Sequence, residues 1–489
     1  MKKVLLVYPG FISREVPLNL LYISAALKKA GYNTRVFELT QYLKNVSLRN
    51  PLKKILKDFT ELLESYRPDI VGFSVMTVGY NIAREMAQAV KNKGIKVIFG
   101  GIHPTVMPEE TIAENFVDFI CIGEGELSVV NFLSRYFSDE DYTRVKGIWG
   151  KDESGKVWRN DIEDLVTDLD SLPFPDRDAL DSHYYNAELT GANVFTSRGC
   201  PYPCSFCQNK FLLNLYEGKG TFVRYRSPEN VYNELEMIIS KYGTERFYFS
   251  DETFTLNKKR ALEFLDGYKT RFKNVPFMCQ TRIDRIDDEV MAALKETGCH
   301  QINLAIESGN AGIRNDVLKK NFTDEQIRTV FGLAKKYNIK TQSFNMIGIP
   351  GETLQNVFET ININKELRPD RVLCTIFMPF SGTELGEKCL EKGGIIANIK
   401  DSSIYYSQVT MKHDNISSRK LIGYQGFFDW YIALPKKYYF LIDFFRWIYQ
   451  SIIPPMPYKN QLLNYIREKI VEFVYQSKRI IIASHVKTR

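Results

Sequence analysis

Short apolar runs alternate with helical patterns through the first 130 residues of the chain. We expect strands at residues 4–8, 34–39, 69–76, 96–99 and 119–122. Between them, apolar positions recur at helical spacing over residues 18–30, 51–66 and 81–92. Continuously apolar strands separated by helices are typical of a parallel sheet that is covered on both faces. The pattern therefore predicts a doubly wound α/β domain over residues 1–140.

A second strand–helix series begins near residue 193. Its expected strands are residues 194–197, 246–250, 277–281, 301–306, 340–346 and 372–378. Capping residues mark two helix starts: Ser227 precedes a proline, and Thr323 with Gln326 fits a capping box. Six repeats are fewer than the eight of a closed barrel, so the pattern predicts a partial (β/α)6 barrel over residues 191–390.

Two further segments complete the predicted organisation. Residues 141–190 are interpreted as a connector, in which the polar segment 151–160 suits a hairpin and prolines exclude a helix at 172–176. Residues 391–489 are predicted to form a helical C-terminal region. Ligands of open α/β sheets bind beyond the carboxyl ends of the strands, so the loops at those ends are the candidate site.

Composition narrows the class of protein. Of 489 residues, 44% are hydrophobic and 25% are charged, which excludes disordered and collagen-like chains. No run of 18 uncharged apolar residues occurs, which argues against a membrane-spanning helix. The eight cysteines are too sparse for a disulfide framework, and three of them cluster, which indicates a reducing compartment and a metal centre. We therefore expect a cytoplasmic protein.

The net charge of +7 is concentrated at the C-terminal end. Residues 391–489 carry +8 and 18 of the 64 aromatic residues, whereas residues 1–390 carry −1. One interpretation is a helical cap with the aromatics in its core. The other is peripheral binding to the inner face of an anionic membrane, with a lipid or lipid-linked substrate. Nucleic acid is not expected, because aliphatics such as Leu441, Ile442, Ile452 and Ile453 offer no advantage on phosphates.

The strongest chemical signal is the spacing of Cys200, Cys204 and Cys207. This C-x3-C-x2-C loop directly follows an expected strand, so it lies at the end of the barrel where active sites form. Three thiolates can hold three irons of a cubane cluster and leave the fourth iron open to a ligand. Structural zinc is the alternative, but it normally takes four ligands as two separated pairs, and the other five cysteines form no second pair.

With the aromatic Phe206 before its last cysteine, this loop resembles that of the radical S-adenosylmethionine (SAM) superfamily. The resemblance implies a 4Fe-4S cluster whose open iron binds the methionine moiety of SAM. It also implies an external electron donor of flavodoxin or ferredoxin type, and cleavage of SAM to a 5′-deoxyadenosyl radical. Further matches follow expected strands and imply SAM contacts at Asp251, Glu252, Arg282, Glu307 and Ser308, with backbone of residues 346–353 at the adenine.

The N-terminal domain resembles the flavodoxin-like cobalamin-binding domain of one radical SAM subfamily. The resemblance rests on residues 17–22, 100–105 and 122–126 and implies cobalamin contacts at Gly100, Gly101, His103 and Glu124. The Asp-x-His-x-x-Gly loop that supplies a cobalt ligand in other cobalamin proteins is missing. Its nearest counterpart, residues 181–186, lacks the glycine, so His183 is interpreted as structural. His103 is expected to shape its loop or touch the edge of the corrin, and bound cobalamin to lack a histidine ligand.

Together these resemblances imply methylation of an unactivated carbon. One SAM would methylate cobalt, and a second would yield the radical that prepares the substrate to accept the methyl group. The first alternative is a radical SAM enzyme that couples, cyclises or rearranges a substrate, possibly a lipid, without methyl transfer. The second is an iron–sulfur redox or scaffold protein that binds no SAM, which leaves the acids at the strand ends unexplained.

Overall fold

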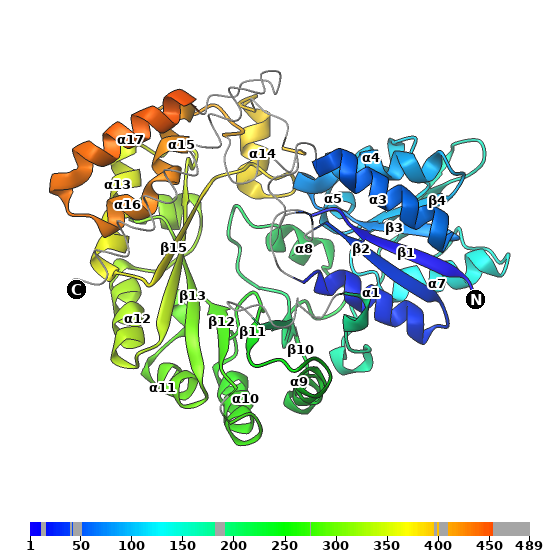
Figure 1. Ribbon diagram of the computed structural model, residues 1–489, viewed down its shortest axis with the longest axis horizontal. Helices are drawn as coiled ribbons and strands as arrows, with labels where there is room; N and C mark the ends of the chain where they lie inside the picture. The colour runs from blue at the N-terminus through cyan, green and yellow to red at the C-terminus, as the bar shows by residue number, and fades with distance from the viewer. Residues whose placement is uncertain are drawn as a thin grey trace.

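The computed structural model describes residues 1–10, 16–39, 42, 51–180, 191–273, 275–395, 399–400 and 409–452. Two α/β units lie side by side, and helices of the C-terminal region cover one edge of the second unit (Figure 1). Each unit is built on its own largely parallel sheet. The predicted fold class is therefore confirmed.

The N-terminal sheet has the order β2-β1-β3-β4-β5-β6-β7. Its parallel strands are β1 (Lys3–Tyr8), β2 (Asn33–Glu38), β3 (Ile70–Ser74), β4 (Lys96–Gly100) and β5 (Phe119–Cys121). Leu5 and Val7 of β1 pack with one helical layer, and Val4 and Leu6 pack with the other. Both faces are thus covered, which is why the strands are continuously apolar. The helices are α1 (Leu18–Lys29), α3 (Pro51–Tyr66), α4 (Tyr80–Lys91), α5 (Ile102–Val106), α6 (Pro108–Ala113) and α7 (Glu126–Phe137).

The predicted hairpin forms, but it belongs to the first sheet. Strands β6 (Ile148–Lys151) and β7 (Val157–Trp158) are antiparallel and extend that sheet beyond β5. Trp158 packs on Phe119 with 6.3 Å between ring centroids, so the hairpin shares the core of the N-terminal unit. The sheet therefore continues past the expected boundary at residue 140, and the connector is shorter than predicted.

The second sheet is a row of six parallel strands in the order β15-β14-β13-β12-β11-β8, which confirms the partial barrel. The strands are β8 (Ala192–Val194), β11 (Phe247–Phe249), β12 (Phe277–Thr281), β13 (Cys299–Glu307), β14 (Lys340–Ile347) and β15 (Arg371–Ile376). Ser227 and Thr323 cap helices as predicted, the latter in a capping box with Gln326. The helices are α9 (Pro228–Tyr242), α10 (Lys258–Arg271), α11 (Asp288–Glu296), α12 (Asp324–Lys336) and α13 (Leu354–Leu367).

The first strand of the barrel is shorter than expected. The prediction placed one strand at residues 194–197, but β8 ends at Val194. The chain then turns into β9 (Ser197–Arg198), which pairs antiparallel with β10 (Arg224–Tyr225). This turn is fixed by Asp251, which accepts hydrogen bonds from the backbone of Thr196 and the hydroxyl of Ser197. A short helix, α8 (Asn209–Leu215), follows and lies at the junction of the two units (Figure 1).

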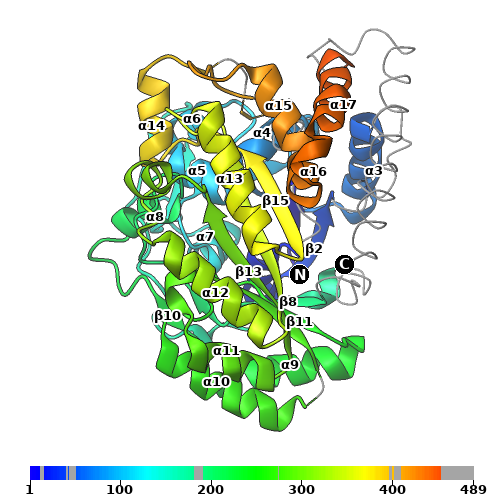
Figure 2. The same ribbon diagram turned by 90° about the vertical axis from the view of Figure 1, so that its left-hand side faces the viewer.

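In the C-terminal region, α15 (Ser418–Gly426) and α16 (Phe428–Ala433) pack beside β15 and α13, and α17 (Tyr439–Ile452) packs on α15 (Figure 2). The helix α14 (Glu384–Glu391) precedes them and lies apart from this group (Figure 1). Phe427, Trp430 and Tyr431 are buried in a shared core, so part of this region is the predicted structural cap. Among the described residues, no helix is long and apolar enough to span a bilayer. Residues 453–489 lie outside the described part of the chain.

Short helical turns complete the described secondary structure. They are η1 (Thr77–Gly79), η2 (Leu169–Ser171), η3 (Arg177–Ala179), η5 (Ile283–Arg285), η6 (Ile313–Val317) and η8 (Lys436–Tyr438). All are 3-10 turns except η6, which is a π-helix. π-Helices occur frequently at functional sites, and η6 follows the strand that ends in Glu307.

Candidate active site at the junction of the two domains

The cysteine loop is held at its centre by Ser205. The Ser205 backbone N–H donates to the Leu318 carbonyl at 3.2 Å, and its hydroxyl donates to the Val317 carbonyl at 2.5 Å. The Ser205 carbonyl in turn accepts from the Leu385 N–H at 2.8 Å. Three hydrogen bonds from a single residue thus fix the loop between η6 and α14, at the carboxyl end of the barrel.

Two of the three thiols lie in surroundings that favour their protonated form. Cys204 is buried, while Cys200 and Cys207 are partly buried. Burial raises the pKa of Cys200, and burial followed by the neighbouring thiols raises the pKa of Cys207 to about 11. Metal ions displace such protons, so the surroundings of these two cysteines fit metal ligands that become charged when the metal binds.

The number of thiols in the loop suits a cluster. Structural zinc normally takes four protein ligands. A cubane gives each of three thiolates its own iron and leaves the fourth iron open. The loop carries three cysteines, which matches the cubane.

Arg282 braces the cysteine loop. Its guanidinium lies 3.5 Å from the centre of the Tyr202 ring, and its Nη1 approaches the Cys204 Sγ at 3.6 Å. The same group donates to the Lys320 carbonyl at 2.7 Å and to Asp284 at 2.9 Å. The sequence predicted that Arg282 contacts SAM. In the structure its donors are directed at the protein, and its charge stands beside a cluster ligand.

The acids after β11 have separate roles. Asp251 is fully buried, and its Oδ1 accepts from Thr196 N–H at 3.0 Å and from the Ser197 hydroxyl at 2.5 Å. Burial raises the pKa of Asp251. Glu252, the next residue, lines the cavity described below, and burial followed by the charge of Asp251 raises its pKa too. Of this predicted pair, only Glu252 is placed to meet a ligand.

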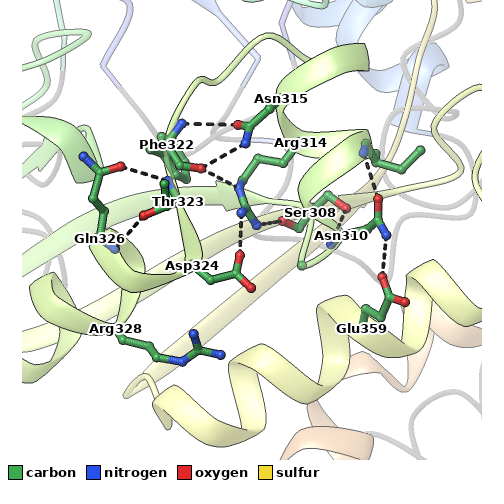
Figure 3. Close-up of polar contacts among 12 residues, drawn as sticks. Ser308, Asn310, Arg314, Asn315, Phe322, Thr323, Asp324, Gln326, Arg328 and Glu359 are labelled. Carbon is green, nitrogen blue, oxygen red and sulfur yellow. Dashed lines mark hydrogen bonds and ion pairs between the residues drawn. The ribbon is translucent and has the colours of Figure 1, made fainter.

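The residues after β13 also differ in orientation (Figure 3). Glu307 adopts a left-handed backbone conformation with φ of 64°, which is strained for a residue other than glycine, and its carboxylate lies 3.4 Å from Lys320 Nζ. The Ser308 hydroxyl accepts from the Asn310 N–H at 3.2 Å. Its carbonyl accepts from Arg314 at 3.0 Å. Both polar groups of Ser308 thus serve the loop.

Arg314 was missed by the sequence analysis. It is fully buried and donates to the carbonyls of Ser308 and Phe322 and to Asp324 (Figure 3). These bonds join the end of β13 to the start of α12 and hold the segment that carries Val317 and Leu318. A buried arginine in a polar stretch has no sequence signal, because nothing in the spacing distinguishes it from a surface arginine.

The loop after β14, expected at the adenine of SAM, is folded around a buried acid. The Glu352 carboxylate accepts from the N–H groups of Gly348 at 2.6 Å and Ile349 at 3.3 Å. Burial raises the pKa of Glu352 to about 8. The side chain of Glu352 therefore fixes the backbone of the loop after β14. A loop that contacts a ligand through main-chain atoms needs such a fixed backbone.

A cavity of about 370 Å³ lies between the N-terminal sheet and the cysteine loop. Its inner part is apolar and includes Leu6, Ile98 and Val129, and Gly72 leaves the floor without a side chain. Its rim is polar and comes from both units. The rim includes Asn19, Ser74, Thr105, Glu124, Glu126, Arg198 and Glu252. Gly199, which directly precedes Cys200, also lines the cavity. The space has the size and mixed lining of a cofactor site.

Three of the predicted cobalamin contacts line this cavity, and His103 does not. Gly100 and Gly101 lie at its edge, and Glu124 faces it while paired with Arg224. His103 instead packs on Tyr80 with 4.4 Å between ring centroids, and its Nδ1 lies 3.2 Å from the Thr77 hydroxyl. Burial, together with the charge of Lys400, lowers the pKa of His103 to about 3. It shapes its loop as a neutral side chain.

Comparisons with known proteins agree with both halves of this site. Residues 11–133 match the B12 binding domain family, and residues 194–363 match the Radical SAM superfamily. An uncharacterized methyltransferase of Pyrococcus horikoshii is 31% identical over 397 residues, which cover 79% of this chain and 82% of that protein. The chain belongs to the cobalamin-binding radical SAM family. Its cofactors are accordingly SAM, a 4Fe-4S cluster and cobalamin.

Other members of the family are more distant. An anaerobic magnesium-protoporphyrin IX monomethyl ester cyclase of Rubrivivax gelatinosus is 27% identical, over 80% of this chain and 70% of that protein. The radical SAM methyltransferase TsrM of Kitasatospora setae has the same fold, with a TM-score of 0.62 and 20% identity over 80% of this chain and 75% of that one. Enzymes of the radical SAM superfamily use an external reductant and act on a small-molecule substrate.

The cluster assignment predicts a selective effect of cysteine substitution. Cys204→Ala should abolish both bound iron, about four per chain in the reconstituted protein, and SAM cleavage, because two thiolates cannot hold three irons. Alanine at Cys279, Cys299, Cys374 or Cys389 should leave the iron content unchanged, since these cysteines are buried in the core. Iron analysis and 5′-deoxyadenosine assays check this. Full iron content in Cys204→Ala would contradict the assignment.

Proposed function

We propose that this protein methylates an unactivated carbon of its substrate. The observation that supports the proposal is the cavity, which runs from the predicted cobalamin domain to Gly199 beside the cluster loop. When bound, the cluster supplies an electron to SAM, and cobalamin carries the methyl group. The role of the chain is to hold these two chemistries side by side and to exclude water from the space between them.

Each part of the site has a task in this proposal. Cys200, Cys204 and Cys207 bind the cluster, and Ser205 and Arg282 keep their loop in place. Glu252 and Glu307 offer carboxylates that can accept hydrogen bonds from the ammonium group of SAM. Gly101 lets the chain after β4 pass close to the backbone of Val75, which a Cβ would meet at 2.9 Å, and this path places Gly100 and Gly101 at the edge of the cavity.

The test is a comparison of two products. In anaerobic assays with reductant, methyl-labelled SAM and metabolite fractions of the source organism, methyl transfer should give equal amounts of S-adenosylhomocysteine and 5′-deoxyadenosine. The label should also appear in a new compound by mass spectrometry. Protein purified with cobalamin should hold about one cobalt per chain. The absence of bound cobalt and of label transfer would refute methylation.

A reaction without methyl transfer is the second candidate, and the cyclase relative of Rubrivivax gelatinosus favours it. The same residues would then bind SAM and the cluster. Only the fate of the substrate radical would differ, since it would couple, cyclise or rearrange. In the assay above, this reaction gives 5′-deoxyadenosine and labelled methionine, but neither S-adenosylhomocysteine nor a new labelled compound. The two candidates are therefore separated by one measurement.

Bound cobalamin should lack a protein imidazole. No histidine is among the described residues that line the cavity, and His103 points into the core. His183 lies outside the described residues. We predict that reduced cobalt shows no nitrogen hyperfine coupling from histidine in electron paramagnetic resonance, and that His103→Phe and His183→Ala leave the cobalt spectrum unchanged. Histidine coupling that one of these substitutions removes would disprove the prediction.

We also propose that the C-terminal region contacts a membrane and that the substrate is a lipid or lipid-linked molecule. The outer side of α17 exposes Phe440 (66%), Phe444 (55%) and Trp447 (63%), which are spaced about one helical turn apart. Lys436 and Lys437 precede the helix. Aromatic side chains opposite the packed side of a helix, with lysines beside them, are typical of helices that lie in a membrane interface.

Liposome flotation tests this second proposal. The full-length protein should float with anionic vesicles at low salt and be released at high salt, because each nearby Lys or Arg contributes roughly 1 kcal/mol. Replacing Phe440, Phe444 and Trp447 together by Ser should weaken binding, whereas Leu373→Ser, which changes an exposed leucine on β15, should not. Protein that stays with the soluble fraction on anionic vesicles would remove the basis for a lipid substrate.

A further inference from the structure

The two domains are joined at the cavity by an ionic cluster. Arg224 donates to both carboxylate oxygens of Glu124, at 2.5 Å and 3.0 Å. Arg198 donates to Glu126 at 2.7 Å and lies 3.4 Å from Glu124. Glu124 lies in the loop between β5 and α7, Glu126 is the first residue of α7, and both arginines belong to the barrel unit. Every ion pair of the cluster therefore crosses the junction between the two domains.

The geometry of the arginines is fixed by their strands. Arg198 and Arg224 are directly opposite each other in the antiparallel ribbon of β9 and β10, so the ribbon presents both guanidinium groups to one loop. The Arg224 side chain is only 3% exposed and that of Glu126 only 6%. Burial raises the pKa of Glu124, but the hydrogen bonds and charges of Arg224 and Arg198 together lower it by more. The net effect is a lowered pKa, so this carboxylate remains charged.

Tyr216, at the C-terminal end of α8, makes a third contact with the same loop. The Glu124 N–H donates to the Tyr216 hydroxyl at 2.6 Å. Gly123 has φ of 82°, and a Cβ there would come within 2.0 Å of the same hydroxyl, so this close approach requires glycine. The barrel unit thus holds the β5–α7 loop from two sides, by charge and by close packing.

The ion pairs connect the wall of the cavity to Cys200, the first cysteine of the iron–sulfur loop. Residues 123–126 and Arg198 all line the cavity. Arg198 is followed by Gly199 and Cys200, and the preceding Ser197 is anchored on Asp251. A shift of the β5–α7 loop would therefore be transmitted to the cysteine loop through two residues of backbone. Apolar contacts cross the junction here too, since Leu18 and Leu21 of α1 belong to the core of the barrel and Tyr216 belongs to that of the N-terminal sheet. The ion pairs add defined distances and angles to this non-directional contact.

We propose that Glu124, Glu126, Arg198 and Arg224 form a clamp that sets the position of the cobalamin domain relative to the cluster loop. They are positioning residues, which revises the sequence prediction that Glu124 binds cobalamin. A buried charge that loses its partner is strongly destabilising, so these ion pairs favour the domain arrangement in which all four charges are paired. The proposal rests on the proposed function for its purpose, but the clamp itself can be tested without cofactors.

The test is a double-mutant cycle on the full-length protein. Glu126→Gln and Arg198→Gln each break the same ion pair, and the double variant removes both partners. Hydrogen–deuterium exchange of residues 122–129 should become about ten-fold faster in each single variant, because the loop loses its tether. The double variant should exchange no faster than the quicker single variant, since the partners act as one unit. Cobalamin affinity, measured by absorbance titration, should weaken about ten-fold in parallel.

Controls separate the clamp from general damage. Glu229→Gln removes a comparable bidentate pair with Arg271 on the surface of the barrel, with bonds of 2.9 Å and 2.7 Å, and should change neither readout. All variants should keep the wild-type iron content, because the cysteines and Ser205 are untouched. Arg198→Lys, which keeps the charge, should restore part of the protection and serves where a glutamine variant does not accumulate.

The outcomes are distinct. Unchanged exchange in the single variants, additive effects in the cycle, or loss of iron in every clamp variant would each overturn the clamp. Wild-type protein that binds no cobalamin would overturn the proposed function instead, and the exchange cycle would still decide whether the clamp exists. Faster exchange with unchanged cobalamin affinity would show a domain contact that does not position the cofactor, and it would also reject the proposal.

Discussion

The structure depends on one constraint: the carboxyl ends of two separate parallel sheets have to meet. Loops at these ends leave the regular hydrogen bonding of the strands, so their backbone groups need other partners. At the junction, the partners are side chains such as Asp251, Ser205 and Arg282, which bind backbone groups or carbonyls of a neighbouring segment. The cysteine loop is rigid because these bonds surround it, and the cavity exists because the two sets of loops are held apart.

Buried arginines are the recurrent means of holding these loops. Arg314 serves two carbonyls and one carboxylate, and Arg282 serves a carbonyl, a carboxylate and the Cys204 thiol. A guanidinium group has five donors in a planar fork, so one side chain can satisfy several carbonyls of an irregular loop. Lysine could not replace it, because a point charge lacks this directional set of donors.

The sequence predicted most of the fold because buried strands contain runs of apolar residues. The strands predicted at residues 4–8 and 277–281 begin with such runs, and the structure has strands at Lys3–Tyr8 and Phe277–Thr281. The errors arose where polar contacts decide the path of the chain. β8 stops at Val194 because Asp251 binds Thr196 and Ser197 just beyond it, and no periodicity in the sequence encodes these hydrogen bonds. The hairpin of β6 and β7 extends the first sheet by antiparallel pairing with β5, and its polar connection carries no signal of that pairing.

The sequence predicted the parts of the site that depend on the spacing of residues along the chain. It did not predict the parts that depend on the orientation of side chains. The three cysteines are fixed by their spacing, and the structure places them on one anchored loop. Asp251, Arg282 and Ser308 were correctly located at strand ends, but their polar groups turn toward the protein, which depends on neighbours that are distant in the sequence. Arg314 and the π-helix left no pattern, because their role depends entirely on tertiary contacts.

The two kinds of contact between the domains differ in what they can specify. Near β15, Val78 of the N-terminal unit packs on Met378 of the barrel in a small apolar cluster. Apolar contact is non-directional and tolerates sliding, so it favours closeness without fixing an orientation. The ion pairs of Arg198 and Arg224 require defined distances and angles, and they lie at the opposite edge of the barrel sheet, beside β8. Apolar contact is present on this side too, through Leu18 and Leu21 of α1 in the barrel core, but only the ion pairs there are directional. In the proposed clamp, the orientation of the two domains is therefore set from the β8 side, where the cysteine loop begins.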